Sequence, residues 1–201
     1  MGRPRQHDER TAAALLEAAE RAVAEFGPEG VSIRGVASDV GTSTRAVYSV
    51  FGSKQGLIAA LGAHAFDLLR EGVANVPITT APDADLVEAG MVVRRFAAEH
   101  PSLFRLTFRN TADPFMHGEP TVRAASAQAL DVLAQRVARL QDAGLLAGRT
   151  VDEATLYLRA LCDGLAGLEL GGSIPSAGAE RFWREALGAL VCGFRLPTPP
   201  P

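Results

Sequence analysis

The chain has 201 residues, of which 47% are hydrophobic and 21% are charged, and its formal net charge is -3. This composition excludes an intrinsically disordered chain, because enough apolar surface is present to build a core. The slightly acidic balance also argues against a protein that coats nucleic acid through bulk positive charge, so any contact with DNA requires a local arrangement of basic side chains.

Targeting signals and metal motifs are absent from the sequence. The first ten residues, MGRPRQHDER, lack the apolar stretch of a secretory signal, and no run of about 18 apolar residues predicts a membrane span. We therefore expect a cytoplasmic protein. Cys162 and Cys192 form no CxxC pair and lie in apolar helical stretches, so we expect two buried thiols, no metal site and no cofactor.

The N-terminal segment contains three predicted helices. Apolar residues recur at three and four positions from Glu9 to Phe26, which predicts a helix that the glycines and proline of 27–30 end. Ser32 is a suitable N-cap for a short helix, and Ser43 for another. Between these two short helices, Gly41 can adopt the positive φ of a turn.

Helical periodicity continues through most of the remaining chain. The segment 76–82 is a predicted linker, 113–120 a predicted loop, and the proline-rich tail 197–201 is expected to be disordered. A boundary falls at His100–Pro101, because the residue before proline avoids the helical conformation. The predicted helices cover about 54–75, 83–100, 103–108, 121–144, 152–171 and 179–194. No strand pattern is present, so the predicted fold class is all-α.

Two short helices joined by a glycine-containing turn form a helix-turn-helix, whose second helix presents its N-terminal residues to the major groove of DNA. The apolar side of this helix consists of Val47, Val50 and Phe51, with Val50 at its edge, and Thr44, Arg45, Tyr48 and Ser49 face outward. Arginine can donate two hydrogen bonds to guanine, and a tyrosine hydroxyl suits a phosphate. Lys54, the only lysine of the chain, begins the next helix, where free backbone N–H groups also favour an anion.

The segment from about Arg10 to Leu61 resembles the tetracycline-repressor (TetR) family of transcriptional regulators. The resemblance rests on the order and spacing of Ala18-Ala19, Phe26-Gly27, Val36-Ala37, Gly41, Tyr48, Phe51, Ser53, Lys54 and Leu57. The resemblance implies that Tyr48 and Lys54 contact DNA phosphates and that the outward-facing residues of the second short helix contact bases. The predicted DNA-binding residues are Ser32, Arg34, Thr42, Thr44, Arg45, Ala46, Tyr48, Ser49 and Lys54.

Two positions of the N-terminal segment depart from the family pattern. Gly35, a poor helix former, precedes the Val-Ala pair, and Arg45 stands where a small residue or proline is more usual, which leaves the operator sequence open. The C-terminal half resembles the WHG branch of the family, named for tryptophan, histidine and glycine, through residues 94–108 and 160–172. Of those three residues only Gly164 is kept, and Asp163 stands in the place of the histidine.

Aromatic and sulfur-containing side chains gather in the C-terminal half and have two interpretations. They pack a core, as aromatic residues often do, or they line a pocket for an apolar effector that a few polar groups orient. The predicted effector-binding residues are Phe66, Phe96, His100, Phe104, Arg105, Phe108, Phe115, Met116, His117 and Asp163.

The last two predicted helices are candidates for a dimer interface. Gly164, Gly167 and Gly171 are spaced by three and four residues and allow another helix to approach closely. Two such helix pairs would form a four-helix bundle across a two-fold axis. The predicted dimerisation residues are Leu161, Gly164, Leu165, Leu168, Trp183, Leu187, Leu190, Val191 and Phe194.

These patterns together predict a homodimeric regulator that binds a palindromic double-stranded DNA operator. The predicted domains are a DNA-binding domain at 1–56 and an effector-binding and dimerisation domain at 57–196. We expect a repressor that a small apolar or amphipathic effector releases from DNA. An activator of the same family and a helical protein-interaction module remain the alternatives. No GxSxG, phosphate-loop or HExxH motif is present, so we predict no catalytic residues and no enzyme.

Overall fold

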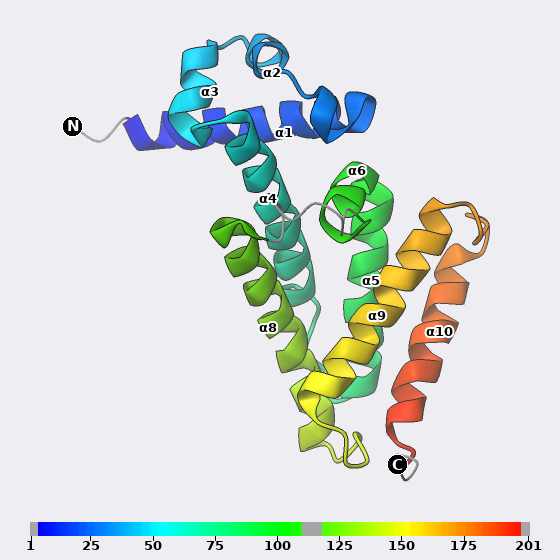
Figure 1. The fold of residues 1–201 in the computed structure, drawn as a ribbon. Coiled ribbons are helices and arrows are strands. Elements are labelled where there is room, and N and C mark those ends of the chain that lie inside the picture. The colour runs from blue at the N-terminus through cyan, green and yellow to red at the C-terminus, as the bar shows by residue number, and fades with distance from the viewer. Residues whose placement is uncertain (1–3, 110–117, 198–201) are drawn as a thin grey trace. The chain divides into compact units, whose positions relative to one another are not determined.

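The computed structural model describes residues 4–109 and 118–197, and within these residues every regular element is a helix. The predicted all-α fold is therefore confirmed. The chain divides into two compact units, Met1–Ala65 with Ser102–Ala124, and Phe66–Pro101 with Ala125–Pro201. We call these the first and the second unit, and Figure 1 shows the helices of both. The predicted domain boundary at residue 56 stays a prediction.

The first unit contains the three N-terminal helices, α1 (Pro4–Gly30), α2 (Ile33–Asp39) and α3 (Thr44–Phe51). Helix α1 begins at Pro4 rather than at Glu9 as predicted, and proline is well suited to a first helical turn because its missing N–H would have no partner there. The break predicted after Phe26 is confirmed, because Gly27 leaves the helical conformation inside α1.

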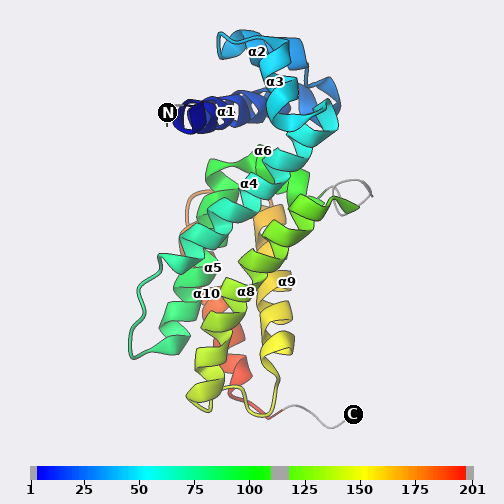
Figure 2. The same cartoon turned by 90° about the vertical axis from the view of Figure 1, so that its left-hand side faces the viewer.

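Helix α2 contacts both α1 and α3, and Figures 1 and 2 show the two short helices against α1. The fully buried side chains include Leu15 of α1 and Val47 of α3. The chain then enters α4 (Lys54–Ala74), whose N-terminal part belongs to this unit. Further along the chain lie α6 (Pro101–Phe104) and the π-helical turn η1 (Arg105–Arg109).

The second unit is a helical bundle that contains α5 (Pro82–Glu99), α9 (Val151–Leu170) and α10 (Ala179–Phe194), together with most of α8 (Pro120–Asp142). Helix α10 runs alongside α5 and α9, as both views show. Among the described residues, no helix is long and apolar enough to cross a bilayer.

A partly buried polar cluster connects three helices of the second unit. Glu169 of α9 accepts hydrogen bonds from Arg94 Nε and Nη2 of α5, at 3.1 and 2.9 Å. The indole nitrogen of Trp183 of α10 also donates to Glu169, at 2.7 Å. Because the indole ring is fully buried, this hydrogen bond satisfies its only polar atom inside the core.

The two thiols differ in exposure, which corrects one prediction. Cys162 is buried in α9, and burial raises the pKa of its thiol to about 12. Cys192 is exposed, although it lies in an apolar stretch as well. Its neighbour Val191 is buried, and one residue turns a helix by about 100°, so Cys192 lies off the packed face.

Candidate nucleic-acid interface

Both short helices of the first unit begin at a serine whose hydroxyl caps them. Ser32 Oγ accepts from the backbone N–H of Gly35 at 3.3 Å, and Ser43 Oγ accepts from that of Ala46 at 3.2 Å. An N-cap oxygen replaces the partner that the first helical N–H groups lack. The caps allow α2 to form even though it contains Gly35, the predicted weak point.

Glycines shape the turn before α3 and its end. Gly41 and Gly52 have φ values of 68° and 73°, which side chains with a Cβ rarely adopt. After the first of them, Thr42 N donates to Ala37 O at 2.8 Å, and at the end of α3 Gly52 N donates to Tyr48 O at 2.9 Å. These bonds fix where α3 begins and ends.

Helix α3 has one buried anchor and a polar outer face. Val47 is fully buried, whereas Val50, predicted to lie at the edge of the apolar side, is 42% exposed. Tyr48 is 52% exposed, so its hydroxyl and part of its ring are open to a ligand. The other outward residues predicted on this helix are also exposed: Thr44, Arg45 and Ser49.

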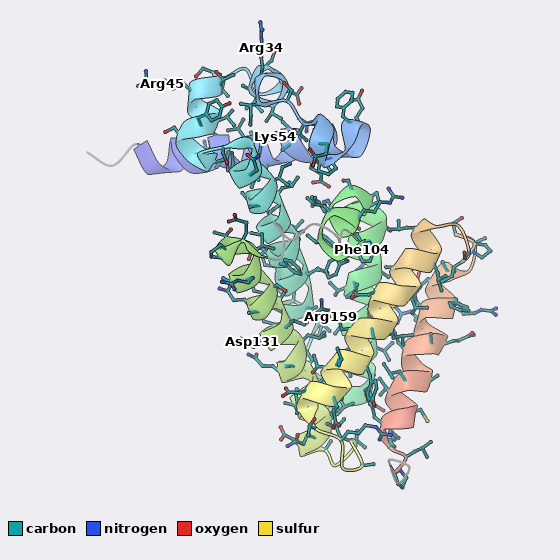
Figure 3. The ribbon with its side chains drawn as sticks, viewed as in Figure 1. Arg34, Arg45, Lys54, Phe104, Asp131 and Arg159 are labelled. Atoms are coloured by element: carbon teal, nitrogen blue, oxygen red, sulfur yellow. The ribbon has the colours of Figure 1, made fainter. Side chains whose placement is uncertain are left out.

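Arg34 of α2 and Arg45 of α3 extend away from the ribbon in Figure 3, and both side chains are exposed. Within the described part of the chain, neither guanidinium takes part in an ion pair. Asp39, the acidic residue at the end of α2, is instead bound by Arg21 of α1 at 2.6 Å. The donors of these two guanidinium groups are thus available to a ligand, whereas the carboxylate of Asp39 is paired with another arginine.

Lys54 has a structural partner that the sequence did not indicate. Its Nζ donates to the backbone carbonyl of Glu29, at the end of α1, at 2.5 Å. The ammonium group has three donors, so this bond leaves others for a phosphate. Two further predicted DNA-binding residues, Thr42 and Ala46, are half-buried around the turn.

The predicted effector-binding residues fall into both units. In the first unit, the rings of Phe104 and Phe108 stack with centroids 5.0 Å apart, and Arg105 is exposed. In the second unit, Phe66 is buried and the rings of Phe96 and His100 lie 5.6 Å apart. Phe115, Met116 and His117 lie outside the described residues.

Asp163 is the polar effector candidate on α9. Burial raises the pKa of its carboxyl, and Arg159, 3.6 Å away, opposes that rise. Within the described chain, no three His, Cys, Asp or Glu side chains are grouped to bind a metal ion.

The predicted dimerisation residues separate into buried and exposed sets. Five have side chains buried within the single chain: Leu165, Trp183, Leu187, Val191 and Phe194. These five pack the second unit, where α10 lies against α5 and α9, and they leave very little side-chain surface for a partner. Leu161 and Leu190 are half-buried, whereas Gly164 and Leu168 are exposed. Any dimer face on these helices therefore has to consist of their exposed residues.

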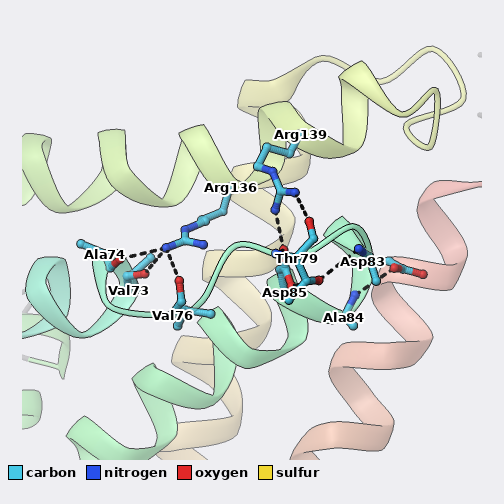
Figure 4. Close-up of polar contacts among 10 residues, drawn as sticks. Val73, Ala74, Val76, Thr79, Asp83, Ala84, Asp85, Arg136 and Arg139 are labelled. Carbon is cyan, nitrogen blue, oxygen red and sulfur yellow. Dashed lines mark hydrogen bonds and ion pairs between the residues drawn. The ribbon is translucent and has the colours of Figure 1, made fainter.

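Sequence reasoning also missed two inward-facing arginines of α8. Arg136 Nη2 donates to the carbonyls of Val73, Ala74 and Val76, at 2.9, 3.0 and 2.7 Å, and Arg139 binds Asp85 (Figure 4). Arg136 lies three residues after Leu133 and four before Leu140, a spacing typical of the apolar face. An arginine at such a position was the available signal that this side chain points inward.

Two segments of the chain match known protein families. Residues 15–61 match the family of bacterial regulatory proteins called the tetR family, and residues 86–190 match the tetracyclin repressor-like C-terminal domain. No curated protein matches the chain. The predicted resemblance to the WHG branch stays a prediction.

Many solved structures share the fold. A protein of unknown function from Rhodococcus sp. RHA1 has a TM-score of 0.79 at 24% identity, covering 91% of this chain and 94% of that chain. The TetR-family regulator PfmR from Thermus thermophilus has a TM-score of 0.65 at 20% identity, covering 88% and 96%. The fatty acid degradation regulator FadR from Bacillus halodurans has a TM-score of 0.74 at 12% identity, covering 90% and 94%.

At these identities the solved structures support the fold alone, whereas the C-terminal family match covers more than half of the chain. Together with the N-terminal match, it agrees with the capped helix-turn-helix and the helical bundle described above. The chain therefore belongs to the tetR family of bacterial regulatory proteins and is a DNA-binding transcriptional regulator.

Proposed function

We propose that this regulator is a homodimeric repressor that a small apolar or amphipathic effector releases from its DNA operator. The observation that carries the proposal is the outer face of α2 and α3. Arg34, Arg45 and Tyr48 are exposed there on two capped helices, and the arginines have no ion-pair partner in the described chain. Repression needs only this surface, because a protein bound over a promoter blocks polymerase by occupying the DNA.

The roles of the individual side chains follow from their geometry. Arg45, near the start of α3, can donate a fork of hydrogen bonds to guanine in the major groove. Arg34, Tyr48 and Lys54 can contact phosphates and thereby fix the register of α3 on the duplex. Thr44 and Ser49 are further candidates for contacts to base edges or backbone.

Exposed apolar side chains on the last two helices support a dimer. Leu156 is 64% exposed, Leu168 49% and Phe182 47%, and the exposed Gly164 would let a partner helix approach. A partner subunit packed on these helices would remove the exposed apolar side chains from water, which favours association. A two-fold dimer would place two copies of α3 on two half-sites about one helical turn of DNA apart, which supports a palindromic operator.

Release by an effector requires that the effector prefer the conformation that does not bind DNA. The element best placed to transmit such a change is α4, because it begins directly after the helix-turn-helix and continues unbroken from Lys54 to Ala74. A shift of its C-terminal end would alter the position of its N-terminal end, and so the spacing of the two recognition helices in a dimer.

The decisive experiment measures binding of the purified protein to the DNA upstream of its own gene, beside a scrambled duplex, across a series of salt concentrations. We expect specific retention that weakens as salt rises, because bound phosphates release counterions. Tyr48→Ala should abolish this retention, and Tyr48→Phe, which keeps the ring, should retain part of it. Arg95→Ala, which removes an exposed arginine of α5, is the matched control and should bind normally.

Two further measurements test the remaining parts of the proposal. Sedimentation should give a dimer for the wild type, and Leu168→Glu should dissociate it without unfolding the chain. In a promoter–reporter assay, deletion of the gene should raise transcription. A fall in transcription would instead identify an activator, and a monomer that binds a single half-site would contradict the dimer.

A further inference from the structure

Arg136 is a buried cation in the interior of the second unit. The residue is only 6% exposed, and its Nη2 donates to the carbonyls of Val73 and Ala74 in the last turn of α4 and to that of Val76 just after the helix. Figure 4 shows this fan of hydrogen bonds. The carbonyls that end a helix have no partner within it, so one guanidinium nitrogen supplies partners for this end of the chain.

The other terminal nitrogen of this guanidinium lacks a partner among the described residues. Nη1 of Arg136 is buried and makes no hydrogen bond to any of them. Arginine stays protonated in proteins, so the group cannot relieve the cost of burial by losing its charge. A buried donor that lacks an acceptor carries the full penalty of its lost hydration. A hydrogen-bond acceptor placed beside Nη1 would remove that penalty.

The charge around Arg136 is also incompletely balanced. Arg139 lies three residues further along α8, and its guanidinium binds the carboxylate of Asp85 at 2.5 Å. Asp85 is 4% exposed and accepts two hydrogen bonds from Thr79 as well. Asp85 is thus paired with Arg139, and among the described residues Arg136 has only carbonyl partners. Carbonyls satisfy its donors, but they do not neutralise its positive charge.

The neighbouring side chains along the same elements are apolar and buried. They include Val137 and Leu140 on α8, Val73 in the last turn of α4 and Val76 just after that helix. A ligand that suited this environment would combine one negatively charged head with an apolar body. Carboxylates form strong, charge-assisted hydrogen bonds with guanidinium groups, and the apolar body would gain from burial.

We propose that Arg136 binds the acidic head of the effector, and that the effector is a small amphipathic carboxylic acid. This inference rests on the proposed effector-controlled regulation and adds the chemical class of the ligand. Because Nη1 is buried, the acid reaches it in an arrangement in which the end of α4 has moved. Binding of the acid stabilises that arrangement, because only there does Nη1 gain the acceptor that it lacks in the described structure.

The test uses the full-length purified protein and straight-chain carboxylates of graded length, each beside the alcohol of the same length. Calorimetry measures the dissociation constants, and operator binding is followed in the same samples. The two probes of a pair differ only in the head group. For at least one length, the acid should bind roughly tenfold more tightly than its alcohol, the ratio that one charge-assisted hydrogen bond supports.

Substitution of Arg136 distinguishes recognition of the acidic head group from binding of the apolar body alone. In Arg136→Gln the preference for acid over alcohol should fall to about one, while Arg136→Lys, which keeps the charge, should retain part of it. The lysine variant also keeps the test informative if the glutamine variant does not fold. Arg123→Gln is the matched control, because it makes the same change at an exposed position of the same helix and should leave the preference intact.

The outcomes are distinguishable from failure of the proposed function. Equal binding of every acid and its alcohol, or an acid preference that survives in Arg136→Gln, would overturn the anion site while leaving operator binding untouched. Acid binding that depends on Arg136 but leaves operator affinity unchanged would keep the anion site and overturn release by an effector. Loss of operator binding on addition of the acid, in the wild type and not in Arg136→Gln, would support both.

Discussion

The arginines on the outer face of α2 and α3 differ in role from those that cross-link the second unit. In the second unit, Arg94, Arg139 and Arg149 form bonds to other helices or to distant parts of the backbone. In the first unit, Arg34 and Arg45 are exposed and have no ion pair in the described chain. The same side chain thus serves as an internal cross-link in the bundle and as a presented donor on the helix-turn-helix. The comparison predicts that arginine contacts control stability in the second unit and DNA affinity in the first.

The largest expected effect comes from removing the carboxylate that binds Arg94. The side chains of Arg94 and Glu169 are only 19% and 16% exposed, so Glu169→Gln leaves a poorly hydrated guanidinium without its counter-charge. We expect a loss of about 3 kcal/mol in the free energy of unfolding. Urea denaturation followed by the fluorescence of Trp183, the only tryptophan, measures this loss.

The control for this variant makes the same change on the surface. Glu180→Gln breaks the pair between Glu180 and Arg184, whose side chains are 63% and 41% exposed. Exposed pairs contribute about 0.5 kcal/mol or less, so this variant should unfold almost as the wild type does. Equal losses in the two variants would contradict the view that burial makes the bonds of the second unit strong.

The next effect tests the first unit. Arg45→Ala removes the predicted guanine contact and should weaken operator binding by about 2 kcal/mol, the discrimination of a good bidentate pair. Stability should not change, because Arg45 is exposed and makes no ion pair with a described residue. Titration of labelled operator, together with a thermal melt, measures both quantities. If Arg45→Ala had a lower melting temperature than the wild type, Arg45 would contribute to the stability of the fold.

The two units also differ in how far the sequence predicted them. The caps at Ser32 and Ser43 and the turn at Gly41 were predicted correctly, because each depends on residues within a few positions. The bond between Arg94 and Glu169 joins residues 75 positions apart, and no local pattern indicates such a partner. Local hydrogen bonds can therefore be read from the sequence, whereas cross-links between helices require the packing to be known.

The apolar side of α10 was also predicted without knowledge of what packs against it. Trp183 and Leu187 were predicted at a dimer face, but both are fully buried within the chain. Helical periodicity identifies which side of a helix is apolar, and it does not identify what covers that side. Arg136 was missed for the converse reason, because its charge obscures its place on the inward face of α8.

A smaller effect is expected at the carboxylate that binds Arg139. Burial of Asp85 opposes its ionisation, but hydrogen bonds from Thr79 and the charge of Arg139 outweigh burial and lower its pKa. A lowered pKa means that the carboxylate stabilises the fold above its ordinary pKa and that this contribution is lost as pH falls through the lowered value. Asp85→Asn should therefore cost about 1.5 kcal/mol at neutral pH.

The pH dependence of stability separates the loss of the Asp85 charge from any change in packing that the asparagine introduces. The difference in unfolding free energy between the wild type and Asp85→Asn should be constant near neutral pH and should narrow below about pH 4, where aspartate carboxyls take up protons. Melting both proteins across this range measures the difference. If the difference in unfolding free energy stayed constant at all pH values below about 4, the charge of Asp85 would contribute nothing to stability.

The smallest effect is expected at Arg34, and it distinguishes a phosphate contact from a base contact. Arg34→Ala should weaken binding to operator and to scrambled DNA by the same factor, about threefold, and should reduce the slope of affinity against salt by about one counterion. Arg34→Lys keeps the charge and should preserve the slope, because phosphate recognition in this interpretation depends on charge rather than on the fork of donors. If Arg34→Ala weakened operator binding alone, Arg34 would read bases, and specificity would then lie on α2 as well as on α3.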